Sequence, residues 1–422
     1  MFIHLGLLRL VRNLSPDRSE RRRLLKASVT LLRHRRRSLA VMKIFLYWLP
    51  ASFHNKLWLW RCLACSALAV RQLSTSQQMS SELVRAISST QAYADAVSTL
   101  SRDRNGYLQR GLEYRSLSRF LCEQPPERLL VFHHYDRCGF LPISWRDALL
   151  AFQSAGWQVV VSTSNIEPMT SSILEQSGVH IARRLNIGLC VGAYRDLAIL
   201  FDSLPQVRSS LSSLVFCNDS ILLVVSPEAL LAQIEEWSSV DYGGPSRSSS
   251  MPLFSGFTDS FERQLYHLQS YFIHANKPLL GHPEWLRFWL YFNIDGTKDE
   301  LIDQGEIGLS QCLLASSIQF RLAYPLVRGL FLDDNMAVEL NKYVITQPEH
   351  VNQTLFAWRS LLARGFPFIK KHVLFSFLDH HGQHMALTQL SRLIPEERFE
   401  LLTRDIEQLM INRYSSGYRH IV

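Results

Sequence analysis

The sequence lacks a long uninterrupted apolar run, and this excludes an ordinary membrane-spanning helix. Near the N-terminus, residues 44–49 and 57–60 are apolar and rich in aromatic side chains, but Pro50 and the polar residues 54–56 separate them. Neither stretch reaches the ~18–20 residues that a bilayer requires. No small-residue cleavage site follows an apolar core, so a secretory signal peptide is not expected.

Positive charge is concentrated at one end of the chain. The net charge is +8, but residues 1–43 hold 12 Lys and Arg against 2 Asp and Glu, or +10, which leaves −2 for the remainder. Arginines near a bilayer attract anionic lipid by ~1 kcal/mol each, and tryptophans favour its interface. We expect residues 1–60 to bind an anionic membrane surface; the composition leaves an Arg-rich organellar transit peptide open. Nucleic-acid binding is not expected, because the remainder is not basic and the basic part shows no binding fold.

Cysteine is scarce and does not form a metal-binding pattern. The seven cysteines are odd in number and lie mostly in apolar stretches, as expected in a reducing compartment. Cys62 and Cys65 have C-x-x-C spacing but no second pair, so they are interpreted as packing residues. The histidines at 380, 381 and 384 have no acidic or cysteine ligands nearby, and a solvated loop is preferred there to a metal site.

Length and composition favour one large domain with extensions. The chain has 422 residues and is 47% apolar, enough for a full core. We divide it into a basic and apolar membrane-surface segment (1–73), a linker with helices (74–127) and a body (128–422), made of a sheet core (128–325) and a helical completion (326–422). In that completion, Asn352 is expected to cap a helix over 353–364 that Gly365 ends.

The body alternates strands and helices. Residues 129–134 and 157–163 are typical of buried strands, and residues 145–154 of an amphipathic helix that stops near Gly156. Another strand is predicted at 214–217, and Ser226 begins a helix over 228–237 with Pro227 at its first position. This alternation predicts an α/β fold with a helix-covered, mostly parallel sheet.

A carboxylate follows the strand at 214–217. Asp219 stands between Asn218 and Ser220, where a ligand of an α/β sheet would lie. Mg²⁺ favours one or two carboxylates together with phosphate oxygens, so Asp219 is predicted to hold Mg²⁺ or Mn²⁺ and, through the cation, a diphosphate. The alternative is a simple turn, which all three residue types favour.

Six separate stretches of the body share their order with a known family. They are VFHHYDRCG (131–139), NIG (186–188) with GAYRD (192–196), NDS (218–220), HLQSYF (267–272), EIGLS (306–310) and GFPFIK (365–370). Together they resemble the rhamnan synthesis F family of bacterial glycosyltransferases, from residue 129 to about 371. The resemblance implies a GT-A-like enzyme that moves a deoxyhexose, with rhamnose expected, from a nucleoside-diphosphate sugar to a glycan or lipid-linked glycan. It also implies a cytoplasmic location, peripheral at the inner face of the bacterial plasma membrane.

The resemblance also implies site residues. It places the nucleotide against the end of the first strand, with Asp136 near the base or ribose; a turn before Gly139 is the alternative role for Asp136. The loop with Asn186, Gly188 and Gly192 would border the nucleotide sugar, with Asn218 nearby, since glycine lets a backbone approach closely. Residues 189–191 lack an acidic residue common in the family. This departure leaves open a non-catalytic, membrane-associated scaffold for polysaccharide assembly.

The remaining candidates concern the sugar and the acceptor. His267 and Gln269 could meet a sugar hydroxyl, or they could belong to a strand with one solvated face. An inverting transferase needs a carboxylate to take the acceptor proton, and Glu306 and Asp241 are the candidates. Glu306 could instead serve the dipole at a helix start. Lys370 or Lys371 could meet a phosphate, or could end a basic helix.

Overall fold

The computed structural model describes residues 112–239, 251–346, 350–378 and 383–415. The predicted membrane-surface segment, most of the predicted linker, Asp241 and the histidines at 380 and 381 lie outside the described residues. Within them, eight strands form a mixed, mostly parallel sheet with helices around it, and this confirms the predicted α/β class. No helix of these residues is both long and apolar enough to cross a bilayer. They divide into two compact units.

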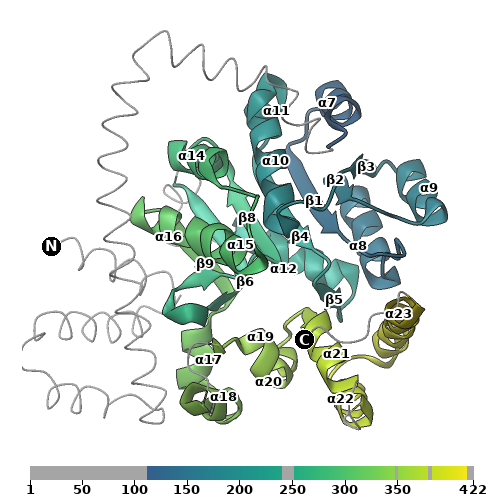
Figure 1. Cartoon of the computed structure of the whole chain (residues 1–422), viewed down its shortest axis with the longest axis vertical. Helices are drawn as coiled ribbons and strands as arrows, with labels where there is room; N and C mark the ends of the chain where they lie inside the picture. The colour runs from purple at the N-terminus through teal and green to yellow at the C-terminus, as the bar shows by residue number, and fades with distance from the viewer. Residues whose placement is uncertain (1–111, 240–250, 347–349, 379–382, 416–422) are drawn as a thin grey trace, which may run out of the picture. The chain divides into compact units, whose positions relative to one another are not determined.

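The parallel-sheet unit comprises the described residues of 112–239, 270–277 and 358–415. Its strands β1, β2, β3 and β4 are mutually parallel in the order β3-β2-β1-β4, and β8 lies antiparallel beside β4 (Figure 1). Because β2 and β3 lie on one side of β1 and β4 on the other, the strand order reverses between β1 and β4. The strands are β1 (Arg128–His134), β2 (Gln158–Thr163), β3 (His180–Arg183), β4 (Ser213–Asn218) and β8 (Phe272–Asn276).

Helices connect these parallel strands. The predicted helix near 145–154 is α8, and it buries Trp145, Leu149 and Phe152 at helical spacing before Gly156 turns the chain with φ of +82°. Glu113 N donates to Arg183 O, so the chain ahead of α7 joins the edge strand β3. The helices are α7 (Tyr114–Glu123), α8 (Ile143–Ser154), α9 (Pro168–Gln176), α10 (Leu189–Ser203) and α11 (Pro205–Ser210).

A second, two-stranded sheet joins distant parts of this unit. Strand β5 (Ile221–Leu223) pairs antiparallel with β10 (Phe368–Lys370), and Trp145 Nε1 donates to Ile221 O at 2.7 Å. Phe368 and Ile369 are buried, as expected for a segment that re-enters the core. The pairing brings residue 371, the start of α21 (Lys371–Leu378), beside the end of β4.

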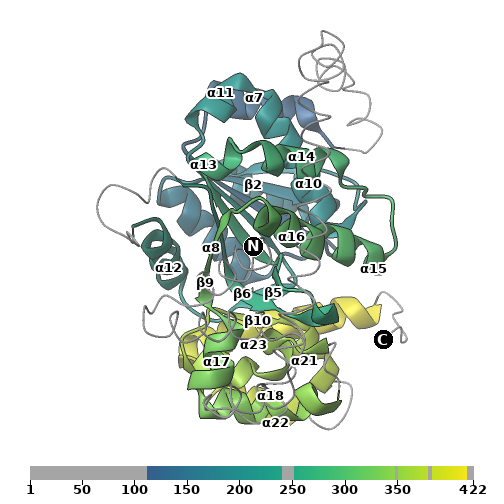
Figure 2. The same ribbon diagram turned by 90° about the vertical axis from the view of Figure 1, so that its left-hand side faces the viewer.

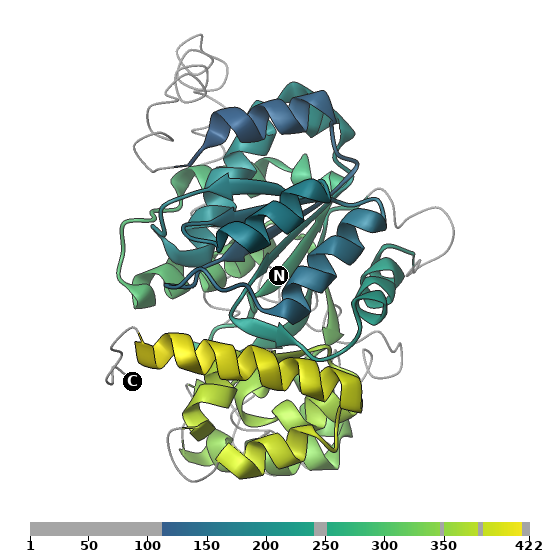
Figure 3. The same ribbon diagram turned by 90° about the vertical axis from the view of Figure 1, so that its right-hand side faces the viewer.

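Two of the remaining helices of the unit, α12 and α23, pack on α8. The α12 helix (Pro227–Ser239) lies beside α8, and Ser226 Oγ accepts from Ala229 N as the predicted cap (Figure 2). The long yellow helix α23 (Glu396–Ser415) also packs on α8 (Figure 3). Its Asp405 accepts from the backbone N–H groups of Ile143 and Ser144, and thus caps α8. The other two helices are α20 (Trp358–Ala363) and α22 (Gln383–Leu390).

The second unit comprises the described residues of 251–269 and 278–357. Its strand β6 (Leu253–Ser260) runs parallel to β9 (Gln319–Tyr324) and antiparallel to the two-residue β7 (His267–Leu268). Its helical elements are α13 (Lys277–Leu280), α14 (Pro283–Tyr291), α15 (Lys298–Leu301), a π-helical segment (Ile302–Ile307), α16 (Gly308–Ala315), α17 (Leu326–Leu332), α18 (Asp334–Thr346), α19 (Gln353–Phe356) and a 3₁₀ turn (Glu262–Gln264).

Two sequence predictions about this region are wrong in detail. The expected strand at 267–272 with one solvated face is instead buried throughout, and the chain leaves β7 after Leu268. The expected helix at 353–364 is interrupted at Ala357, which separates α19 from α20. Asn352 does cap α19, since its Oδ1 accepts from Thr354 N, and Gly365 follows α20 with φ of +84°.

Candidate functional site

The Asp219 carboxylate lies directly after β4, at the carboxyl edge of the parallel strands. Asp219 N donates to His133 O at 3.1 Å and so extends the pairing of β4 with β1. Lys371 N donates to Ser220 O, and Lys371 Nζ donates to Asp219 Oδ2 at 3.0 Å. The side chain of Lys371 is 15% exposed and that of Asp219 is 13% exposed. The predicted carboxylate therefore stands where expected, but it forms an ion pair with a residue 152 positions away.

The charges around Asp219 keep it ionised. Burial alone would raise the pKa of Asp219, but Lys371, His134 and His133 together hold it below its ordinary value. The pKa of His133 falls from 6.5 to about 4, because burial, followed by the charge of Arg184, lowers it more than Asp219 raises it. At neutral pH, the site thus carries a carboxylate, an ammonium group and an uncharged imidazole.

The Asn218 amide is engaged within the protein. Its Oδ1 accepts from Ser220 N at 3.0 Å, which is the turn that these residue types favour. Its Nδ2 donates to the hydroxyl of Tyr194, and this hydroxyl donates to Ser270 O. Asn218 therefore shapes the turn that presents Asp219. The turn and the carboxylate site, which the sequence leaves as alternatives, coexist here.

Lys371 in its observed position would repel a divalent cation beside Asp219, and the cation predicted there stays a prediction. Two unit charges about 4 Å apart near a protein surface repel by about 4 kcal/mol, and a dication doubles this. Among the described residues, no three or more His, Cys, Asp and Glu side chains are grouped so that they could hold a metal ion. The predicted Mg²⁺ or Mn²⁺ would have a single carboxylate ligand here and would have to displace an ammonium group.

The predicted glycine loop is only partly a loop: Asn186 and Gly188 lie between β3 and α10, but Gly192 lies in the first turn of α10. A Cβ at Gly192 would collide with Ile187 O and come within 3.1 Å of Arg184 Nη2. The backbone at Gly192 thus lies close to a carbonyl of the protein itself, whereas the prediction was a close approach to a ligand. Arg184 also donates to Ile187 O and forms a fully buried ion pair with Asp196 at 2.9 Å, which fixes the loop.

The start of α10 is strained. Gly188 has φ of +73° and Leu189 has φ of +56°, which places a branched side chain in the left-handed region. Such a residue costs roughly 1–3 kcal/mol, and residues of this kind cluster at functional sites. Leu189 begins the segment 189–191, where the sequence departs from the family that it resembles. Asn186 of the same loop is partly exposed and neighbours His133.

Asp136 has the turn role that the sequence allows. Its Oδ1 accepts from Cys138 N at 2.9 Å and from Phe140 N at 3.0 Å, and Gly139 follows with φ of +79°. One carboxylate oxygen is therefore committed to the loop after β1. Contact with a base or ribose stays a prediction for Asp136.

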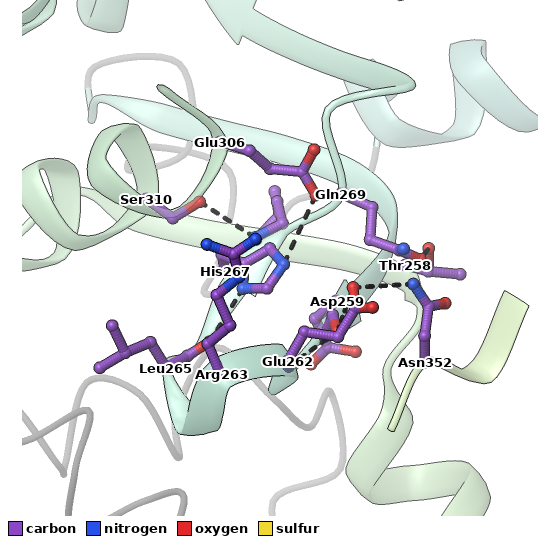
Figure 4. Close-up of polar contacts among 12 residues, drawn as sticks. Thr258, Asp259, Glu262, Arg263, Leu265, His267, Gln269, Glu306, Ser310 and Asn352 are labelled. Carbon is purple, nitrogen blue, oxygen red and sulfur yellow. Dashed lines mark hydrogen bonds and ion pairs between the residues drawn. The ribbon is translucent and has the colours of Figure 1, made fainter. Parts of the chain in front are cut away.

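In the second unit, Glu306 and His267 meet, although the sequence proposes them for separate roles. Glu306 Oε1 lies 3.4 Å from His267 Nε2, while His267 Nδ1 donates to Leu265 O at 2.8 Å (Figure 4). His267 is 1% exposed and Glu306 is 18% exposed. Burial lowers the pKa of His267, but Glu306 and Glu262 outweigh it and raise the pKa above its ordinary value.

The backbone around Glu306 shows that the alternative role at a helix start is wrong. Glu306 lies in the π-helical segment, which continues from α15 into α16 without a break. It is therefore not at a helix start, and the helix dipole does not explain its carboxylate. π-Helical turns frequently mark functional sites.

Gln269 is held by its own chain. It is buried, and its Oε1 accepts from Thr258 Oγ1 at 2.7 Å and Thr354 Oγ1 at 3.3 Å. Contact of Gln269 or His267 with a sugar hydroxyl stays a prediction.

Asp259, which lies beside Thr258, was not predicted from the sequence. Burial raises its pKa to about 7, and its Oδ1 accepts a hydrogen bond from Leu326 N. The strand that carries it, LFSGFTDS, mixes apolar and polar residues and gives no clear signal that this carboxylate is buried.

The predicted site residues fall into two groups, one in each unit. The parallel-sheet unit contains Asp136, Asn186, Gly188, Gly192, Asn218 and Asp219, and the second unit contains His267, Gln269 and Glu306.

A scan of the sequence against protein-family models gives no match, and a search among curated proteins gives none. The resemblance to the rhamnan synthesis F family therefore stays a prediction.

Proposed function

We propose that the chain is a glycosyltransferase that uses a nucleoside-diphosphate sugar and binds the donor at the carboxyl edge of β1 and β4. The observation that carries this proposal is the position of Asp219 and Lys371 where the strand order reverses. In open α/β sheets, ligands bind outside the carboxyl ends of the strands at this point. The parallel order β3-β2-β1-β4 with the antiparallel β8 beside β4 also supports the GT-A-like assignment.

The transfer would move a deoxyhexose, with rhamnose as the expected sugar, to a growing cell-surface glycan. The bond between the anomeric carbon and the diphosphate oxygen breaks, and its electron pair stays on the diphosphate. The acceptor hydroxyl attacks the anomeric carbon and gives its proton to a carboxylate. Glu306, which contacts the buried His267 in the second unit, and Asp241, which lies outside the described residues, stay the two candidates for this carboxylate.

A non-catalytic scaffold for polysaccharide assembly is the second candidate. It is favoured by the ion pair that engages Asp219 Oδ2, and by the left-handed Leu189 where the family has an acidic neighbour. A scaffold on this fold would keep the nucleotide-binding edge or lose it, but it would not break the sugar–phosphate bond. Turnover therefore separates the two proposals.

The test is release of nucleoside diphosphate from a panel of nucleotide sugars by the purified full chain. We expect one donor to be hydrolysed or transferred, and Asp219→Asn to lower the rate by about 100-fold, as for loss of other groups that organise a charged transition state. Glu127→Gln is the matched control, because Glu127 is exposed and lies before β1, at the opposite edge. Binding without turnover of any donor would support the scaffold instead.

Membrane association belongs to the same proposal. Residues 1–60 would hold the enzyme on the anionic inner face of the bacterial plasma membrane, near a lipid-linked acceptor. Removal of residues 1–73 should release the protein from anionic liposomes in a flotation assay. Retention of the truncated protein on the liposomes would place the anchor elsewhere.

A further inference from the structure

The ion pair at the edge of the sheet places a cation where the sequence predicts a metal ion. Lys371 Nζ lies 3.0 Å from Asp219 Oδ2, and the two residues are also joined through the backbone bond from Lys371 N to Ser220 O. An ammonium group has three donor hydrogens, and Asp219 Oδ2 engages one of them. The Lys371 side chain is 15% exposed, so it is mostly buried by the protein but not sealed from solvent.

The helix that begins at Lys371 adds to this positive charge. The eight residues of α21 start at Lys371, directly after β10. The first backbone N–H groups of a helix have no intrahelical acceptor, and the aligned peptide dipoles favour an anion at this end. The lysine and the helix start are therefore one electropositive feature, and Asp219 fixes the lysine in it.

We propose that Lys371, positioned by Asp219 at the carboxyl edge of β4, binds the diphosphate of the donor in place of a divalent cation. The inference rests on the proposed function, because it names the group that holds the leaving diphosphate. Asp219 is then a positioning residue, and Lys371 is the group that touches the ligand. When the sugar–phosphate bond breaks, the ammonium group matches the charge that remains on the diphosphate.

The proposal predicts nucleotide binding that needs no metal. The experiment titrates the full chain with UDP, dTDP, GDP and CDP by calorimetry, once with EDTA and once with Mg²⁺ or Mn²⁺. For the nucleotide that binds, we expect affinities within about threefold in the two buffers. Lys371→Met should weaken binding by about tenfold or more, since a charge-assisted bond to phosphate is lost.

Two further variants keep the result interpretable. Lys371→Arg retains the positive charge and should restore most of the affinity. Lys277→Met is the matched control: Lys277 Nζ donates to Ser209 O, and Lys277 follows Asn276, which pairs with Ser213 at the amino end of β4. Lys277→Met should therefore leave the affinity unchanged. Circular dichroism confirms that each variant is folded.

The outcomes separate this inference from the proposed function. Binding that requires Mg²⁺ or Mn²⁺ would overturn the role of Lys371 and return Asp219 to the cation, with the transferase proposal intact. Metal-free binding that Lys371→Met does not weaken, while the variant remains folded, would also overturn it. If no nucleoside diphosphate binds in either buffer, the proposed donor site itself is wrong.

Discussion

Replacement of His133 should change how the stability of the protein depends on pH. The imidazole is buried on β1 beside Asp219, and its pKa falls from 6.5 to about 4. Between pH 4 and 6.5, His133 is therefore protonated in the unfolded chain but not in the folded protein. The stabilising effect of the neutral His133 is thus complete above pH 6.5 and is lost as the pH falls toward 4.

The magnitude follows from the two pKa values of His133. A difference of about 2.5 pH units, at 1.36 kcal/mol per unit, corresponds to about 3 kcal/mol of unfolding free energy. Asp259 acts in the opposite direction: its pKa is raised to about 7, so its contribution is lost as the pH rises through that value. The wild-type profile therefore mixes effects of opposite sign from several groups, and comparison with a variant is needed to isolate that of His133.

The assay is urea unfolding of the wild type and His133→Asn, followed by tryptophan fluorescence at pH values from 4 to 7.5. The free-energy difference between the two proteins should shrink by about 3 kcal/mol as the pH falls from 6.5 to 4. His350→Asn is the control, because His350 is exposed. Parallel profiles for the wild type and His133→Asn would refute the buried, neutral imidazole.

Two further predictions concern single contacts. Gly192→Ala should lower the unfolding free energy by about 1–3 kcal/mol, because its Cβ would collide with Ile187 O. The control is Gly296→Ala, whose Cβ meets only side-chain atoms and which should lower the unfolding free energy less in the same urea experiment. Equal losses of unfolding free energy in the two variants would contradict the predicted collision. Glu306→Gln should lower the pKa of His267 in an NMR titration, because the carboxylate that raises it is removed; an unchanged titration would show that the contact in Figure 4 does not control this histidine.

Local pattern was enough to predict three of the four parallel strands, β1, β2 and β4, but not the four-residue β3. Buried strands and the amphipathic helix α8 have periodicities that appear in any short window, and Asp219 follows its strand directly. The same information could not give Lys371 as the partner of Asp219, because strand pairing of β5 with β10 creates that contact across 152 residues.

The second unit was harder to predict, because burial there departs from local pattern. The polar residues of 267–272 alternate as in a half-solvated strand, but Gln269 is buried with Thr258 and Thr354 as hydrogen-bond partners. Such partners come from distant segments and satisfy polar atoms that would otherwise need water. The π-helical turn that carries Glu306 likewise has no short-range signal in the sequence.

The central claim is that a nucleoside diphosphate binds where the strand order reverses, outside β1 and β4. Photoaffinity labelling with an azido analogue of the bound nucleotide tests this most directly, with labelled peptides identified by mass spectrometry. The account predicts labels within residues 133–140 or 218–226, and their loss when unlabelled nucleotide competes. Competed labels confined to residues 251–269 or 278–357 would contradict it.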